Sequence, residues 1–421
     1  MNALTIASKE QFFEQLADAF ADKIADTEAK KITDFAKQHF AHIPLEELAN
    51  RRFSDTYGGI LSAWQFLQKR ETFESPVSVF NPDLESDGWQ STHTVIYILH
   101  PNMPFLIDSL RIAINQREIG THLIQHSILQ VERDAEGKLE KLYPPKKKTA
   151  DTQYEAFIVL EIDRHSNTED LHELEEVIQT ILHEVRIAVN DFPIVKEKVS
   201  QISEELEGTA AYMDDEYKQE AKAFLDWLVK DHFTFLGYDE YDFVKDKKGM
   251  VVRRVENSEL GILRVNNERP DMVRLNELPQ RTRHEMTRTD DIFIFAKSAQ
   301  RSRVHRPAYP DYIAVKKFDE KGNVVGERRF LGLYTSRVYN ERPDEIPLLR
   351  RKFQTVMRRS GFMREDYAGK ELDQILTVYP RDELFEIEPS DLLAVAKNIL
   401  YIQERRRIEL FMREDVYGQF V

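Results

Sequence analysis

The chain has 421 residues, 41% hydrophobic and 32% charged, which is enough apolar material for packed cores and too much for a disordered protein. A net charge of −15 argues against nucleic acid and anionic membranes as partners, because both require a basic protein surface. The absence of cysteine excludes disulfides and cysteine-ligated metal centres, and together with the lack of a signal peptide or long apolar run it favours a cytoplasmic protein.

Residues 1–75 are predicted to form an N-terminal helical region. Ser8 and Gln11 have the spacing of a capping box, and apolar side chains follow at steps of four: Phe12, Leu16 and Phe20. A second helix is expected over residues 28–41 and a third from about Pro44, with Gly58-Gly59 as a candidate kink. The expected structure is a small helical bundle.

Residues 76–190 are predicted to form an α+β domain. Strands and helices are expected in the order strand, helix, strand, strand, helix, over residues 95–99, 104–117, 121–133, 157–162 and 166–185. This order is typical of a split βαβ unit, also called ferredoxin-like, with an antiparallel sheet and helices on one of its faces. The predicted core consists of Val95, Ile98, Leu106, Leu110, Ile128, Val159, Leu160, Leu174 and Ile181.

The remaining sequence divides into three predicted parts. Residues 191–230 are expected to be a helical connector, and residues 231–340 a second, mostly antiparallel α+β domain with a hairpin turn at Lys321-Gly322. Residues 341–421 are expected to be helical. The last five residues resemble the approach to a strand, which predicts a further domain downstream.

A search for catalytic motifs finds no glycine-rich dinucleotide turn, no phosphate-binding loop and no H-E-x-x-H metal motif. His122 and His126 would share one face of a strand, but a metal site usually needs a third protein ligand, so surface histidines are the favoured interpretation. We therefore assign no catalytic, cofactor-binding or metal-binding residue to the chain.

Two charged runs leave alternatives open. The run from Tyr379 to Phe385 has the groups of an acid–base site, but a turn that caps a helix and forms ion pairs is favoured. Strand-like alternation would place Arg301, Arg303 and His305 on one face, where they form either a phosphate or carboxylate site or a contact to an acidic domain or subunit surface.

The segment Asn102–Ile107, followed by a helix, resembles the first strand–helix junction of ACT domains, which bind amino acids and regulate metabolic enzymes. The resemblance implies a ligand site at Asn102, Met103 and Asp108: the helix start would offer N–H groups to a carboxylate, and Asp108 would hold an ammonium group or only stabilise the helix. ACT junctions usually have glycine where this chain has Phe105, and a phenylalanine would fill the space a ligand needs.

A series of motifs along the rest of the chain is similar to the N-terminal region of the large bacterial NAD-dependent glutamate dehydrogenases: Phe233–Tyr238, Leu260–Arg264, Val304–Tyr309, Arg329–Ser336, Ile346–Lys352, Tyr379–Phe385 and Gln403–Arg407. The resemblance implies ACT-like and PAS-like domains and helical motifs, with the catalytic domain far downstream. It also implies NAD as the cofactor of the full-length protein, none in this segment, and as partners the protein's own catalytic domain, other subunits of a homo-oligomer and an amino-acid effector.

Three functions are compatible with these observations. The first is a regulatory and assembly region of an oxidoreductase. The second is a structural oligomerisation arm without a ligand, which Phe105 favours. The third is a free-standing enzyme with an unrecognised site.

Overall fold

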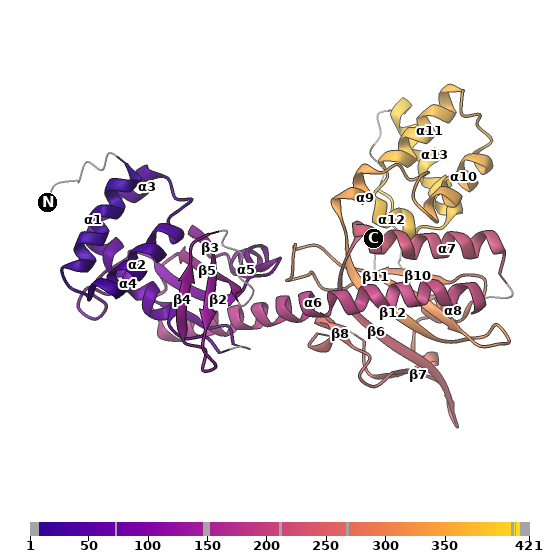
Figure 1. The fold of residues 1–421 in the computed structure, drawn as a ribbon. Coiled ribbons are helices and arrows are strands. Elements are labelled where there is room, and N and C mark those ends of the chain that lie inside the picture. The colour runs from indigo at the N-terminus through magenta and orange to yellow at the C-terminus, as the bar shows by residue number, and fades with distance from the viewer. Residues whose placement is uncertain are drawn as a thin grey trace. The chain divides into compact units, whose positions relative to one another are not determined.

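The computed structural model describes residues 8–71, 74–145, 152–209, 213–266, 269–405, 408 and 410–412, and it has the mixed α+β architecture that the sequence predicts (Figure 1). The chain forms two compact units. The first comprises Met1–Val185 with Arg303–Arg306, and the second Arg186–Ser302 with Pro307–Val421. The predicted strand approach at residues 417–421 lies outside the described residues.

The first unit begins with four helices, α1 (Lys9–Ala21), α2 (Asp26–His39), α3 (Leu45–Ala49) and α4 (Phe53–Leu67). The predicted cap of α1 is confirmed, since Ser8 Oγ accepts a hydrogen bond from the backbone N–H of Gln11 at 3.2 Å. The expectation of one helix from Pro44 is wrong, because the chain leaves the helical path between Ala49 and Phe53.

A five-stranded antiparallel sheet follows, in the order β1-β2-β5-β3-β4. Its strands are β1 (Val77–Phe80), β2 (Thr94–Pro101), β3 (Thr121–Arg133), β4 (Leu139–Tyr143) and β5 (Gln153–Ile162). Helix α5 (Leu106–Asn115) joins β2 to β3 with β5 between them, so the predicted split βαβ arrangement is confirmed. Strand β1 lies beside β2, where a ferredoxin-like domain usually has its last strand, and the chain after β5 continues as α6 (Thr168–Thr209).

Helices cover both faces of this sheet, whereas the sequence predicted helices on one face only. Val95, Tyr97, Leu99, Phe157 and Val159 share a core with buried residues of α1, α2 and α4. The residues that alternate with them, such as Ile96, Ile98 and Ile158, are also fully buried, and they face the side of the crossover helices α5 and α6.

The predicted core residues of this unit are buried with the exception of Ile128, which is 54% exposed. Odd-numbered residues of β3 face α2, where Gln125 Nε2 donates to the carbonyl oxygen of His39 at 2.7 Å and Ser127 Oγ lies 2.9 Å from His39 Nδ1. Alternation places Ile128 on the opposite face, at a point that the crossover helices leave open. Burial lowers the pKa of His39 to about 3, so its ring is neutral there.

The second unit contains a seven-stranded sheet whose strand pairs are antiparallel, in agreement with the mostly antiparallel α+β character that the sequence predicts. Its path is β10-β11-β12-β6-β7-β9, and β8 pairs with β6. The strands are β6 (Phe233–Asp246), β7 (Gly249–Arg254), β8 (Leu260–Gly261), β9 (Met272–Arg274), β10 (Phe293–Lys297), β11 (Asp311–Phe318) and β12 (Val324–Tyr334). Gly322, at φ +80°, lies in the predicted turn between β11 and β12.

Helices pack on this sheet from three parts of the chain. Before the sheet come the second half of α6 and α7 (Asp215–Trp227), which continues into a π-helical turn, Leu228–His232. Between strands lie α8 (Gln280–Thr287) and two 3-10 turns, Ile262–Arg264 and Leu275–Glu277. After the sheet come α9 (Ser336–Asn340), α10 (Leu349–Ser360), α11 (Tyr367–Val378), α12 (Arg381–Glu386) and α13 (Pro389–Arg405).

The main core of this unit joins α6, α7 and the helices after the sheet to one sheet face through residues such as Val199, Phe224, Phe235, Phe330 and Phe353. A smaller cluster on other strand residues includes Tyr241, Ile294 and Met286 of α8. No helix in the described part of the chain has an apolar stretch of bilayer length.

Candidate functional site

The loop between β2 and α5 carries the ligand site predicted from the ACT resemblance. Asn102 and Asp108 are exposed and Met103 is half-buried. Phe105 precedes the helix with φ 72° and ψ −3°, a left-handed conformation that glycine adopts without strain. The backbone therefore has the shape that favours glycine in ACT junctions, although the side chain is a phenylalanine.

The segment Arg303–Arg306, which belongs to the same compact unit, packs against this loop. The ring centroids of His305 and Phe105 lie 4.6 Å apart with 45° between the ring planes. The backbone N–H of His305 donates to Ser109 Oγ at 3.2 Å, and Ser109 is fully buried. His305 also has a left-handed backbone, with φ 73°. The chain itself thus covers the side of the loop that Phe105 faces.

The prediction that Arg301, Arg303 and His305 share one strand face is wrong, because residues 303–308 form bends and no strand includes residues 301–308. The guanidinium of Arg301 lies 5.3 Å from the ring centre of Tyr309. Arg303 forms an ion pair with Glu184, which is buried, and burial raises the pKa of that carboxyl. Arg303 thus contacts a carboxylate of its own compact unit, and the predicted contact to an acidic domain or subunit surface stays a prediction.

The two separately predicted patches therefore meet at one place, since His305 lies on Phe105 and within electrostatic range of Asp108. Burial and the charge of Arg306 lower the pKa of His305, while Asp108 opposes this shift. An amino acid could approach the loop backbone only after the His305 ring had moved away.

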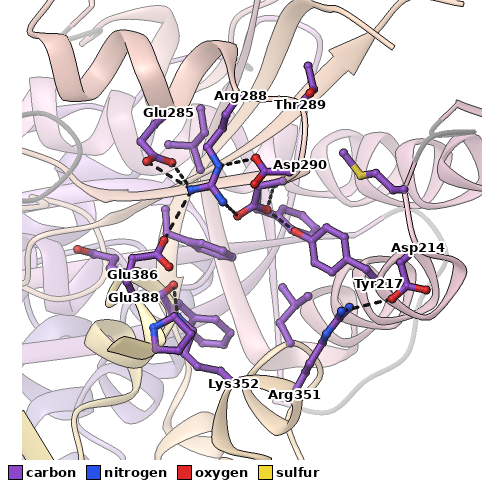
Figure 2. Close-up of a pocket in the computed structure, with 18 of the residues that line it drawn as sticks. Asp214, Tyr217, Glu285, Arg288, Thr289, Asp290, Arg351, Lys352, Glu386 and Glu388 are labelled. Carbon is purple, nitrogen blue, oxygen red and sulfur yellow. Dashed lines mark hydrogen bonds and ion pairs between the residues drawn. The ribbon is translucent and has the colours of Figure 1, made fainter. Parts of the chain in front are cut away.

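The second unit contains a cavity of about 790 Å³ that the sequence did not predict (Figure 2). Its walls come from α7, α8 and the segment after α8, β10, the β11–β12 hairpin, α10, and the α12–α13 region. Because these elements are distant in sequence, only the folded chain brings the lining residues together.

One wall of the cavity is built around Arg288. Its guanidinium lies within 4 Å of four carboxylates: Asp290 at 2.9 Å, Glu285 at 3.1 Å, Asp291 at 3.6 Å and Glu388 at 3.7 Å. Burial alone would lower the pKa of Arg288, but the hydrogen bond to Asp290 and the charges of Asp291 and Glu285 raise it above its ordinary value. Behind this wall, Lys316 Nζ donates to the carbonyl oxygen of Arg288 at 3.0 Å.

Arg351 and Lys352 form the wall that Figure 2 shows on the opposite side from Arg288. Lys352 Nζ donates to three carbonyl oxygens at the end of α12, those of Leu384, Phe385 and Ile387, at 2.7–3.0 Å. Arg351 is 3.3 Å from Asp214 and its guanidinium lies 5.5 Å from the ring centre of Tyr217. The side chain of Arg351 is 42% exposed, so it can exchange its partner.

Aromatic side chains form the apolar part of the cavity. Phe293 and Phe295 come from β10 and Phe385 from α12, and the rings of Phe295 and Phe385 stack with centroids 5.4 Å apart. The hydroxyl of Tyr217 donates to Asp291, and burial followed by the charge of Asp291 raises its pKa well above its ordinary value. The cavity thus combines an acidic wall, a cationic wall and an aromatic surface.

The run Tyr379–Phe385 is the turn and helix start that the sequence favoured. Arg381 donates to the carbonyl oxygens of Tyr379 and Glu341, and Asp382 forms an ion pair with Lys297 at 2.7 Å. Only Phe385 of this run lines the cavity. A sequence signal for the cavity exists in the dense charges from Glu285 to Asp291, which the sequence analysis did not single out.

Of the two histidines considered as metal ligands, His122 contacts other side chains in the structure. His122 lies at an irregularity of β3 and pairs with Asp163 at 2.8 Å, while its ring stacks on His93. Across the described residues, no three His, Cys, Asp or Glu side chains are grouped as metal ligands.

Comparison with known families identifies two regions of the chain. Residues 35–178 match the ACT1 domain of glutamate dehydrogenase, and residues 346–405 match helical motif 1 of glutamate dehydrogenase. The first match covers the last turn of α2, then α3, α4, the five-stranded sheet, α5 and the first turns of α6. The second covers α10 to α13.

The proteins similar to this chain include three bacterial NAD-specific glutamate dehydrogenases. The protein of Halomonas elongata is 44% identical over 96% of this chain, and that of Pseudomonas aeruginosa is 41% identical over the whole chain. The protein of Mycobacterium tuberculosis is 25% identical over 84% of it. These matches cover 25%, 26% and 20% of the relatives, so the chain spans about a quarter of the length of the first two.

Proposed function

Since the chain belongs to the family of large NAD-specific glutamate dehydrogenases, of which it spans about a quarter, we propose that it is their regulatory and assembly region. The parent reaction converts glutamate, NAD and water into 2-oxoglutarate, ammonium and NADH. In this proposal the chain itself performs no step of that reaction and changes the activity of a catalytic domain elsewhere in the parent.

The observation that carries the proposal is the ACT1 match on a complete split βαβ domain. Residues 35–178 include the β2–α5 junction with its left-handed backbone at Phe105, which is the part of an ACT domain that receives an effector. The cavity of the second unit adds a preformed space for a small molecule. A ligand changes activity only if it binds two states of the protein with different affinity.

The remaining parts of the proposal follow from the family. We propose that the parent is a cytoplasmic homo-oligomer, that the second unit is a PAS-like module, and that the chain contacts its own catalytic domain and other subunits. Amino acids are the proposed effectors, and neither nucleic acid nor membrane is a proposed partner, given the net charge of −15.

Two measurements test whether this chain by itself oxidises glutamate or binds the nicotinamide cofactor. With glutamate and NAD, the 421-residue chain should produce no NADH, and titration of NADH followed by its fluorescence should show no saturable binding. A micromolar dissociation constant for NADH, or steady production of NADH, would contradict the proposal.

The contact between His305 and Phe105 favours a second function, that of a structural arm without an effector. In that case the ACT-like domain serves only to hold segments of the protein together. The two functions are separated by measuring how amino acids change the activity of the parent enzyme, before and after the proposed ligand-binding side chains of this region are replaced. A structural arm predicts that the replacements leave the effect of amino acids on activity unchanged.

A further inference from the structure

We propose that the cavity of the second unit binds a neutral amino acid, as a zwitterion, with an aromatic or large apolar side chain. The proposal rests on the regulatory function given above and assigns to it a site and a class of ligand. The ammonium group would lie at the wall of Arg288, the carboxylate at Arg351, and the side chain on the phenylalanines between them.

The wall of Arg288 carries more negative than positive charge, which favours a cationic group of the ligand there. Four carboxylates, those of Glu285, Asp290, Asp291 and Glu388, face one guanidinium and the ammonium of Lys316, which leaves an excess of two negative charges. Asp290 and Glu388 are 77% and 53% exposed, so they can accept hydrogen bonds from a ligand without unfolding the wall. An ammonium group placed there would have charged acceptors on more than one side.

The opposite wall carries the positive charges of Arg351 and Lys352, which favour an anionic group of the ligand there. Lys352 is fixed, since its three N–H donors are used by three backbone carbonyls, and its charge therefore stays at the cavity. The guanidinium of Arg351 lies 5.5 Å from the ring centre of Tyr217, within range of a cation–π contact, and its pair with the half-exposed Asp214 is weak in water. A ligand carboxylate can replace Asp214 as the partner of Arg351 at little cost.

The space between the walls is apolar. Phe295 is half-buried and presents a ring surface on which an aromatic or aliphatic side chain would bury its area, while the buried rings of Phe293 and Phe385 pack against it and hold it in place. A volume of about 790 Å³ is in the range of small-molecule sites, so the cavity accommodates the largest natural amino acids. Six carboxylates and five cationic side chains line the cavity, so a zwitterion matches its charges better than a polyanion such as a nucleotide.

Matched ligands test the assignment of the two charged ends. Isothermal titration of the 421-residue chain with L-phenylalanine should show saturable binding. Phenethylamine lacks the carboxylate and 3-phenylpropanoate lacks the ammonium group, so each should bind about tenfold more weakly or worse. L-Glutamate should also bind more weakly, because its second carboxylate would lie on the apolar surface that receives the ligand side chain.

Two variants with matched controls test the residues. Arg351→Gln should weaken the binding of L-phenylalanine about tenfold, so that L-phenylalanine and phenethylamine bind with nearly equal affinity. Glu388→Gln should likewise weaken L-phenylalanine about tenfold, so that L-phenylalanine and 3-phenylpropanoate bind with nearly equal affinity. Arg359→Gln, on the exposed side of α10, and Asp391→Asn, three residues after Glu388, should leave binding unchanged. Thermal unfolding of all four variants establishes that they are folded.

Failure of this inference is distinct from failure of the proposed function. Absence of L-phenylalanine binding, equal affinity for the three phenyl ligands, or unchanged affinity in Arg351→Gln and Glu388→Gln would each overturn the site. If binding follows the predictions but L-phenylalanine leaves the dehydrogenase activity of the parent enzyme unchanged, the site stands and the regulatory function is wrong.

Discussion

The loop after β2 and the cavity of the second unit differ in what occupies them. The loop has the sequence pattern and backbone of a ligand-binding junction, but the chain's own His305 lies on it. The cavity has no recognisable motif, yet it stays open, with charged groups on two walls. A family resemblance thus locates a backbone shape, while side chains distant in sequence decide whether that shape is available to a ligand.

The two places also differ in how their charges are balanced. At the loop, the buried carboxylate of Glu184 is paired with Arg303, and His305 contributes an uncharged ring contact. At the cavity, four carboxylates share Arg288. Where every charged side chain already has a partner of opposite charge, a charged ligand adds little binding free energy. Where charges of one sign are in excess, each opposite charge of the ligand can form a new ion pair.

Helix α5 carries the loop, so its packing determines whether the loop keeps its shape. Leu110 is 1% exposed, and Leu110→Ala should lower the free energy of unfolding by about 2–5 kcal/mol, the usual cost of a buried cavity. Chemical denaturation measures the loss. A change below about 0.5 kcal/mol, the range of surface substitutions, would show that the helix does not support the loop in this way.

Behind the Arg288 wall of the cavity, the contribution of Lys316 to the stability of the folded chain depends on pH. Burial lowers its pKa from 10.5 to about 8, so between these values the unfolded chain holds a proton that the folded chain has released. Stability should therefore rise with pH by up to about 1.4 kcal/mol per pH unit above pH 8, and that part should be lost as the pH falls through 8.

Comparison with Lys316→Met isolates this effect. Unfolding of both proteins between pH 8 and about 9.5 avoids the titration of tyrosines, whose ordinary pKa is about 10. The slope should be present in the unchanged chain and absent in the variant. Equal slopes would mean that Lys316 keeps its ordinary pKa behind the wall of Arg288.

The smallest expected change in stability belongs to Phe105→Gly. The substitution relieves a left-handed backbone, worth about 1 kcal/mol, and removes a ring contact with His305 of about 0.5–1.5 kcal/mol, so the net change should stay below about 1 kcal/mol. Binding is the more informative measurement. In an Arg351→Gln background, Phe105→Gly should gain amino-acid binding at the loop, and this gain should disappear with Asn102→Ala or Asp108→Ala.

The sequence was sufficient to predict the strands and helices whose faces are uniformly apolar, such as β2, β5 and α5. It failed at Ile128, because the neighbouring Gln125 and Ser127 are buried by hydrogen bonds to His39, 86 and 88 residues away. No local pattern contains that contact. The strand predicted at residues 301–305 failed for a similar reason, since Arg303 and His305 are held by Glu184 and Ser109 and not by a neighbouring strand.

The site was predictable only in part. The resemblance led to Asn102, Met103 and Asp108. The structure adds that Phe105, which stands where ACT junctions have glycine, adopts the left-handed backbone conformation that favours glycine. The cavity escaped prediction because residues such as Tyr217, Arg288 and Arg351 come from three separate elements, and each has an ordinary role as a helix or turn residue when seen alone.

Helix α6 determines how the protein can be dissected. The boundary between the two compact units falls between Val185 and Arg186, inside this helix and not in a loop. Val185, Ala188 and Val195 on either side of the boundary are buried, so a fragment cut there would expose apolar surface at a frayed helix end. Proteolysis should therefore spare the boundary, and fragments ending at residue 185 should aggregate where the uncut chain stays in solution.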